Sequence, residues 1–263
     1  MKIFRIGKSL LIMMICLNFF SCSRDEYEEP AKDEDIIVPK EKKLKQIKYR
    51  NATGAFIYDF NYDEKNRVTV IMRTNENAEG QILQKHVTNY TWKANSIVNE
   101  NNGSVYILDN NRVTTIYSFD NYIYECSYDK GNHLIRLQDV EDPSWAELWE
   151  WSGEKMLEYA DNNGDSEKYI YNEKGCNGYL PIFLTVFRLY EDDIFYAHPE
   201  LIGIRSSQLP DKSEYVAGDE PYFSNTTMYN YTFDENGYVT NCTITNRDNS
   251  GKNNMLVYTF TWQ

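Results

Sequence analysis

The chain repeats a two-residue alternation of aromatic or β-branched positions with polar ones along most of its length. Between residues 56 and 62, aromatic side chains fill every second position, and two of the three residues between them are polar. This period predicts antiparallel β-strands with one face packed and the other in water. The same alternation returns at residues 68–72, 113–119, 122–128 and 229–233.

The turns between these strands also share one plan. In segments 62–68, 128–134 and 233–239, an aromatic residue ends one strand and Asp starts the turn. Asn or Gly then takes the positive-φ position, and an aliphatic residue begins the next strand. Looser copies at 109–112 and elsewhere predict a β-meander of about a dozen or more strands, which must curl, split or close. We therefore predict an all-β fold, a curled antiparallel meander forming a partial barrel or half-barrel.

One segment breaks the alternation. Residues 178–212 lack a clean period and contain Pro181, Pro199 and Pro210. Because proline cannot donate to a strand ladder, this stretch does not fit the interior of a sheet. We predict a helical or irregular insertion that covers one side of the curved sheet.

The first 21 residues have the layout of a secretory signal. Basic residues precede an apolar run at 10–17, which is too short to cross a bilayer. Ser21 directly before Cys22 resembles a bacterial lipobox, in which the cysteine sulfur receives a diacylglycerol. Phe19 and Phe20 depart from the usual Leu and small residue of that box. A cleaved signal with a coincidental cysteine is the alternative, and we predict lipidation of Cys22.

The next segment is charged and contains two prolines but few large apolar residues, which is typical of a flexible tether. Its acidic start, just after Cys22, resembles the export signal that sends Bacteroidetes lipoproteins to the outside of the outer membrane. The composition of a solvated tether would give the same cluster. The predicted organisation is a signal peptide at 1–21, a tether at 22–43 and one β domain at 44–263.

Charge and cysteine content restrict the partners. The formal net charge is -13, so phosphate backbones would repel the protein, and nucleic acid is excluded as a partner. Beyond Cys22 there remain Cys126, Cys176 and Cys242. Their odd number permits at most one disulfide, and their spacing leaves the pair open. Buried free thiols are the default interpretation.

The C-terminal part carries a family resemblance. The segments 201–210, 229–239 and 257–262 resemble a Bacteroidetes cell-envelope lipoprotein family of unknown function, described as having a porin-like fold. The hairpins that pair an aromatic residue with Asp also resemble the YD repeats of wall-associated proteins. The resemblance implies a curled, many-stranded sheet or partial barrel in the envelope, and it implies no catalytic residues. A membrane-spanning barrel is disfavoured, because one face of the strands carries Thr, Asn, Asp, Lys and Arg.

Motifs for catalysis or metal binding are missing from the sequence. His86, His133 and His198 lie far apart, with none of the spacings of a zinc site. Segment 161–167 resembles a calcium loop, but Ser166 replaces its glycine, so a hairpin is favoured. Paired carboxylates of a glycosidase cannot be assigned among 40 acidic residues. We predict a non-enzyme without cofactor or metal.

One tryptophan-rich segment suggests a binding site. If 145–151 is a strand, Trp145, Glu147, Trp149 and Trp151 share one face. Indole faces beside carboxylates suit sugar rings, whereas core packing is the structural alternative. The predicted function is a lipoprotein anchored to the outer membrane through Cys22 that binds a glycan or a partner protein. The alternatives are an assembly subunit of an envelope complex and, less favoured, a glycoside hydrolase.

Overall fold

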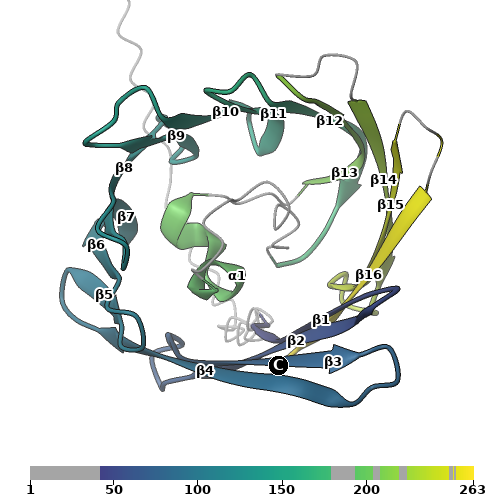
Figure 1. Cartoon of the computed structure of the whole chain (residues 1–263), viewed down its shortest axis with the longest axis horizontal. Coiled ribbons are helices and arrows are strands. Elements are labelled where there is room, and N and C mark those ends of the chain that lie inside the picture. The colour runs from purple at the N-terminus through teal and green to yellow at the C-terminus, as the bar shows by residue number, and fades with distance from the viewer. Residues whose placement is uncertain (1–41, 179–192, 204–207, 219–223, 249–250, 252) are drawn as a thin grey trace, which may run out of the picture. The chain divides into compact units, whose positions relative to one another are not determined.

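The computed structural model describes residues 42–178, 193–203, 208–218, 224–248, 251 and 253–263. Sixteen antiparallel strands follow one another around a closed barrel (Figure 1). They are β1 (Leu44–Asn51), β2 (Gly54–Tyr62), β3 (Val68–Asn77), β4 (Ile82–Trp92), β5 (Ser96–Asn99), β6 (Val105–Asp109), β7 (Arg112–Tyr117), β8 (Ile123–Tyr128), β9 (Leu134–Asp139), β10 (Ala146–Ser152), β11 (Lys155–Asp161), β12 (Ser166–Gly175), β13 (Gln208–Val216), β14 (Ser224–Phe233), β15 (Val239–Asp248) and β16 (Asn253–Trp262).

The meander closes because its first strand pairs with its last. β1 and β16 run antiparallel, with Leu44 opposite Trp262 and Tyr49 opposite Tyr258. Backbone hydrogen bonds of 2.9 Å run in both directions between Lys43 and Gln263. The prediction of a partial barrel or half-barrel is therefore wrong. An open meander would leave two unpaired edge strands, and closure satisfies their backbone groups.

Aromatic and aliphatic side chains fill the inside of the barrel. Cross-strand register places Ile47 opposite both Tyr58 and Phe260, and all three are buried. The stripe of aromatic residues at 56–62 predicted from sequence lies on this inner face. In the sequence alternation, the aromatic and aliphatic residues therefore face the barrel interior and the residues between them face the exterior.

A repeated hydrogen bond fastens the hairpins. An aromatic side chain near the end of an even-numbered strand donates to a backbone carbonyl oxygen near the start of the preceding strand. The donor–acceptor distances are 2.5–2.8 Å. The pairs are Tyr62–Leu44, Trp92–Val68, Tyr128–Val113, Trp151–Leu134, Tyr171–Met156, Tyr231–Pro210 and Trp262–Val239. The aromatic residue of the repeat therefore has a specific polar role beside its apolar one.

The predicted turns form at the same end of the barrel. In the turns after β2, β8 and β14, the carboxylates of Asp63, Asp129 and Asp234 accept backbone N–H groups from within the turn. The positive-φ residues are Asn66, Asn132 and Gly237, as the sequence predicted. We call this end the Asp-turn end and the opposite one the loop end.

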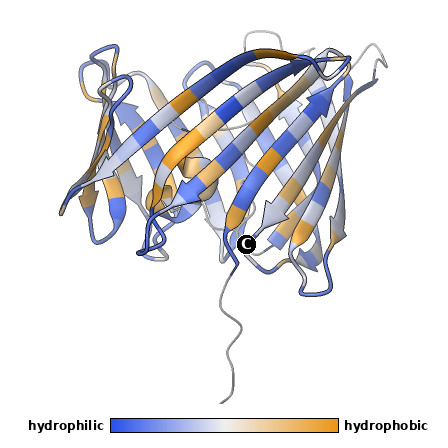
Figure 2. Ribbon diagram, turned by 90° about the horizontal axis from the view of Figure 1, so that it is seen from below, coloured by the Kyte–Doolittle hydropathy of each residue, from blue (hydrophilic) through white to orange (hydrophobic). Residues whose placement is uncertain are grey.

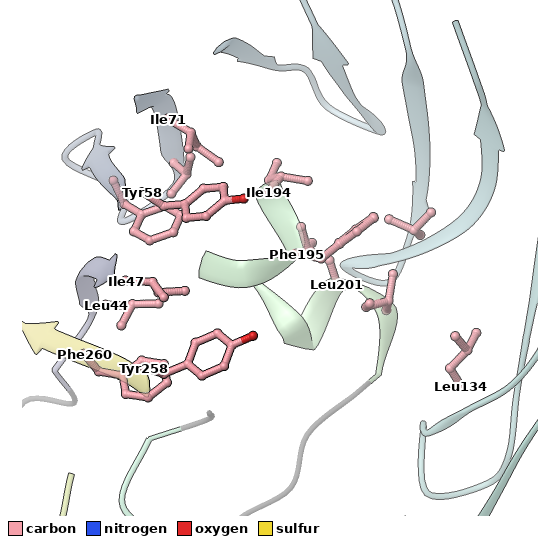
Figure 3. Close-up of a cluster of buried hydrophobic side chains, with 14 of the residues drawn as sticks. Leu44, Ile47, Tyr58, Ile71, Leu134, Ile194, Phe195, Leu201, Tyr258 and Phe260 are labelled. Atoms are coloured by element: carbon pink, nitrogen blue, oxygen red, sulfur yellow. The ribbon is translucent and has the colours of Figure 1, made fainter. Parts of the chain in front are cut away.

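Two short helices lie inside the ring of strands (Figure 1). They are α1 (Ile194–Ala197) and η2 (Pro199–Ile202), and together we call them the plug. Ile194, Phe195 and Leu201 are buried against strand residues of the core (Figure 3). The ring of Phe195 meets that of Tyr106 edge-on, with centroids 5.5 Å apart.

Residues 193–203 of the predicted insertion contain two short helices, but two features of the prediction are wrong. The plug lies within the barrel and does not cover one side of a curved sheet. Residues 208–212 also belong to a strand, β13. An open sheet would have exposed its apolar face to a covering layer, whereas a closed barrel leaves that face only the interior. Residues 179–192 and 204–207 of the predicted insertion lie outside the described residues.

The outer face of the barrel carries charged pairs as well as exposed apolar side chains such as Val87, Leu148 and Met228. Lys48 and Glu76 form an ion pair of 3.1 Å across it, and Lys168 and Glu158 form one of 3.5 Å. Hydrophilic residues recur along the strands in Figure 2. Among the described helices, none has the length and apolar character needed to cross a membrane.

The three cysteines of the β domain are free thiols, as the default interpretation predicted. Cys242 is buried, and Cys126 and Cys176 are partly buried. Burial raises the pKa of the Cys126 thiol to about 12, and the Tyr128 side chain opposes this by hydrogen bonding. The Cys126 thiol is therefore protonated and inert near neutral pH.

Candidate functional site

The inner face of the barrel changes from apolar to polar along the barrel axis, from the Asp-turn end to the loop end. On β15, the inward residues run from Cys242 and Ile244 near the Asp-turn end to Asn246 and Asp248 near the loop end. On β14, buried Tyr229 gives way to Asn225 in the same direction. The apolar half therefore forms the core, and the polar half is left toward the loop end.

Solvent reaches inward side chains at the loop end on one side of the ring. Gln84 and His86 of β4 share the inner face with Asn75 and Arg73 of β3, and both are exposed. Asn254 of β16 is also inward and exposed. Because β1 pairs with β16, the strands β13 to β16 and β1 to β4 form one continuous surface there. We call it the amide–aromatic face; its residues are Tyr49, Phe56, Arg73, Asn75, Gln84, His86, Tyr215, Asn225, Asn246 and Asn254.

Stacked rings form the aromatic part of this face. The Tyr49 ring lies 4.8 Å from that of Phe56, with an angle of 11° between the planes. On its other side Tyr258 lies 5.5 Å away, at 30°. Tyr49 and Phe56 are only partly buried, so their rings border solvent. Burial raises the pKa of Tyr49, while the nearby Arg73 lowers it. The result is a stack of three rings across three adjacent strands, with Tyr49 between Phe56 and Tyr258.

Amide side chains supply the hydrogen-bonding part. The side-chain oxygens of Asn75 and Asn225 are buried and accept no hydrogen bond from the described residues. Asn246 donates to the hydroxyl of Thr227 at 3.2 Å. An amide offers two donors and one acceptor atom, so this face can both donate to and accept from a polyhydroxylated ligand.

One cation faces the interior on the described strands. Arg73 lies opposite Tyr58 across β2 and β3, and the two side chains are hydrogen bonded. The pKa of the Tyr58 hydroxyl is raised to about 12, first by burial and then by the charge of Asp193, while Arg73 opposes the shift. Among the described residues Arg73 forms no ion pair, so the guanidinium keeps donors for a ligand.

A second polar group lies deeper, on β12 and β13. The Glu167 carboxylate accepts hydrogen bonds from Ser213 at 2.5 Å and from Tyr169 at 3.1 Å. The Ser213 and Tyr229 hydroxyls lie 3.0 Å apart. Burial raises the pKa of Glu167, and the hydrogen bonds oppose that shift without cancelling it. This network is a buried connection between strands.

The raised pKa of Glu167 gives a prediction for stability against pH. The folded protein binds the Glu167 proton more tightly than the unfolded chain does. The stabilisation from that proton is therefore full below the unfolded pKa and is lost as pH rises through the folded pKa. We expect the free energy of unfolding of Glu167→Gln, relative to the wild type, to rise between pH 4 and pH 7 in urea titrations.

Asp234→Asn is the matched control for this measurement. The pKa of Asp234 is lowered, chiefly by the hydrogen bond from the Lys42 ammonium. Its contribution is therefore present above the unfolded pKa and lost as pH falls, so the variant should show the opposite slope. Parallel pH profiles for the two variants would contradict the assignment for Glu167.

The structure brings the four residues of the predicted tryptophan site to the inner face. Glu147, Trp149 and Trp151 alternate on β10, and Trp145 directly precedes the strand. Glu147 and Trp149 are 2 % and 4 % exposed, and Trp151 donates to the Leu134 carbonyl oxygen. These placements are those of core residues. Ligand binding at this segment remains a prediction, and the amide–aromatic face lies on other strands.

The remaining chemical candidates occupy structural positions. Asp161 starts a hairpin, and its carboxylate accepts the backbone N–H groups of Asn163 and Asp165, so the hairpin interpretation is confirmed. No group of metal-ligating side chains occurs among the described residues. His133 is buried and stacks on Trp151 with centroids 4.6 Å apart. The lipidation site Cys22, the predicted signal peptide and nearly all of the predicted tether lie outside the described residues and stay predictions.

Sequence reasoning missed the amide–aromatic face, although a signal for it was present. On the inward stripe of β3, Ile71 is followed by Arg73, Asn75 and Asn77. On that of β16, Phe260 and Tyr258 are preceded by Asn254. On several strands the inward-facing positions change from apolar to amide residues at one end. This change indicates that apolar side chains fill only part of the barrel interior. Only the barrel register shows that these ends meet.

The closed barrel with an aromatic interior defines the class of this protein as an antiparallel β-barrel. It is similar to a porin-like protein from Bacteroides uniformis, with a TM-score of 0.62 and 16% identity, covering 84% of this chain and 98% of that one. A porin-like protein from Bacteroides vulgatus gives a TM-score of 0.53 and 12% identity, with the same coverage. No protein family model and no curated protein matches the chain. At these identities the likeness shows the fold alone.

Proposed function

We propose that the protein is a cell-envelope lipoprotein, anchored through Cys22, that binds a glycan without catalysis at the amide–aromatic face. The observation that carries the proposal is the exposure of Gln84, His86 and Asn254 on the inner side of the barrel. Binding sites typically combine aromatic side chains with a few solvent-accessible polar groups. The inner side of this barrel has both.

The chemistry of the face suits a sugar. The apolar C–H groups of a sugar can pack against the stacked Tyr49 and Phe56 rings where the stack borders solvent. Its hydroxyls need donors and acceptors at the edge of that contact, and the amides of Asn75 and Asn246 supply both. Arg73 adds donors without an acceptor. The described residues assigned to this face include no carboxylate.

The outer surface supports a soluble barrel held at a membrane rather than a pore through it. The charged outer pairs Lys48–Glu76 and Lys168–Glu158 would lie on the lipid-facing side of a spanning barrel, where charged side chains are unfavourable. The plug also fills the interior toward the Asp-turn end.

The point of chain entry fits an anchored orientation. Lys42 pairs with Asp234 at 2.7 Å, and its backbone N–H donates to the Tyr238 hydroxyl. The chain therefore enters the barrel at the Asp-turn end. A lipid on Cys22 connects to that end, while the amide–aromatic face lies at the other.

Binding to defined glycans tests the site. Neutral oligosaccharides and soluble peptidoglycan fragments would be titrated into the purified protein by calorimetry. We expect Asn254→Ala and Asn246→Ala each to weaken binding about tenfold, because each removes one hydrogen-bonding group from a partly desolvated contact. Thr259→Ala, on the outer face of β16, is the control and should leave affinity unchanged. Failure of every glycan to bind, or equal affinity in all three variants, would overturn the glycan proposal.

The anchor is tested separately by fractionation. Cys22→Ala is expected to move the protein from the membrane to the soluble fraction, and mass spectrometry of the wild type should find an acylated Cys22. A Cys22→Ala chain that still sediments with membranes would contradict the anchor while leaving the binding site standing.

A further inference from the structure

Neighbouring strands of the barrel differ in length beside β4. β4 has eleven residues, Ile82–Trp92, whereas its neighbour β5 has four, Ser96–Asn99. Only Tyr90, Thr91 and Trp92 pair with β5. On that side, therefore, the first half of β4 has no strand beside it among the described residues.

An asparagine side chain marks where the pairing stops. The side-chain oxygen of Asn101 accepts the Asn89 backbone N–H at 2.7 Å, and its amide nitrogen donates to the Val87 carbonyl oxygen at 2.8 Å. The Asn101 amide thus takes the place of a neighbouring strand. Asn89 and Val87 direct these groups toward β5, so the two-residue period directs those of Lys85 the same way.

Beyond Asn101 the strand edge is open to solvent. No described residue accepts the N–H or donates to the C=O of Lys85 on this side, and all residues from Ile82 to Val87 are exposed. Ile82 and Leu83 are 55% and 69% exposed. Unpaired backbone groups beside exposed apolar side chains form a template for another strand.

We propose that this edge, residues 82–87 of β4, binds an extended acidic segment of a partner protein by β-strand addition. The proposal does not depend on glycan binding, because it uses the edge-facing backbone of β4 and its outward side chains, whereas Gln84 and His86 of the amide–aromatic face are inward. The partner's backbone would pair with the Lys85 N–H and C=O and accept from the Val87 N–H. A carboxylate on the partner would lie opposite the Lys85 ammonium, which forms no ion pair with any described residue.

Charge disfavours a second copy of the chain as the occupant. The Val87 carbonyl is already occupied, and Leu83 lies at a register shift against β3, so Lys85 is the residue with both backbone groups open. Antiparallel self-pairing would therefore place Lys85 opposite Lys85 of the copy, on the same outer face. Like charges directly opposite one another destabilise a strand pair.

Two peptides that differ at one position test the proposal. A fluorescent Thr-Val-Glu-Val-Thr-Val peptide and its Lys-for-Glu counterpart would be titrated into the purified Cys22→Ala protein. We expect the acidic peptide to bind about tenfold more tightly. We also expect the amide of Lys85 to gain protection from hydrogen exchange in the complex.

Two variants of Lys85 separate the backbone from the charge. Lys85→Pro removes the edge-facing N–H but no bond to β3, and should lower the affinity for the acidic peptide at least about tenfold. Lys85→Thr keeps the N–H and should bind both peptides equally. Lys85→Thr, which keeps the backbone of β4 intact, should retain glycan binding. Absence of peptide binding at millimolar concentration, undiminished binding by Lys85→Pro, or dimerisation through β4 would overturn the proposal.

Discussion

Replacing Gly203 with alanine is expected to destabilise the protein by roughly 3 kcal/mol or more and to loosen the plug from the Asp-turn end. Gly203 follows η2 and has a φ of 66°, a conformation that costs an L-residue about 1–2 kcal/mol. A Cβ atom there would lie 2.2 Å from the Asn132 carbonyl oxygen and 3.0 Å from the Leu134 nitrogen. Both are backbone atoms of the β8–β9 hairpin, so neither can move aside without disturbing the barrel. Urea unfolding followed by tryptophan fluorescence would measure the loss.

Gly153→Ala separates the effect of conformation from that of collision. Gly153 has a similar φ of 57°, but a Cβ at this position would meet nothing within 4 Å. We expect this variant to lose only about 1 kcal/mol. An equal loss of unfolding free energy in the two variants would show that Gly203 is needed only for its positive φ. The close approach of Gly203 to the β8–β9 hairpin would then not stabilise the plug.

Replacing His198 with alanine is expected to cost about 2–4 kcal/mol. His198 precedes η2, and its Nε2 accepts the backbone N–H of the buried Val68 at 3.1 Å. Its Nδ1 lies 2.7 Å from a carboxylate oxygen of Glu200. A ring that accepts at Nε2 is neutral and donates from Nδ1. The alanine variant would leave the Val68 N–H buried without an acceptor.

Aromatic contacts add to the loss at this position. The His198 ring meets Trp92 edge-on, with centroids 5.4 Å apart, and meets Tyr62 at 6.0 Å. His86→Ala is the control, because His86 is exposed and its truncation should change stability by no more than about 0.5 kcal/mol. Thermal and urea unfolding of both variants would test the difference. A loss below 1 kcal/mol for His198→Ala would contradict its role in holding the plug to β3.

Much of the local structure could be predicted because it depends on neighbours in the chain. The two-residue repeat at Phe56–Tyr62 predicted a strand and its buried face, since successive side chains point to opposite sides. The Asp and Asn of the 62–68 turn predicted a hairpin, since Asp63 accepts N–H groups a few residues ahead and Asn66 tolerates positive φ.

The sequence predicted that aromatic residues would form a binding surface, but it did not predict which residues come together. The sequence drew attention to Trp149 as an aromatic surface, but the barrel places it in the core. Asn75 and Asn254 were not predicted to be site residues, because an asparagine near the end of a strand is common and by itself indicates no site. They belong to one face only after β1 pairs with β16, which joins segments near the two ends of the domain.

By itself the sequence determined that the domain is an antiparallel meander with a defined inside, because side-chain alternation and turn chemistry act over a few residues. Only the tertiary structure decided that the meander closes, that the segment 193–203 enters it, and that the first half of β4 stays unpaired. These outcomes depend on pairings between distant segments and on the unequal heights of neighbouring strands. No pattern within one segment encodes them, since their free energy comes from contacts that exist only in the folded barrel.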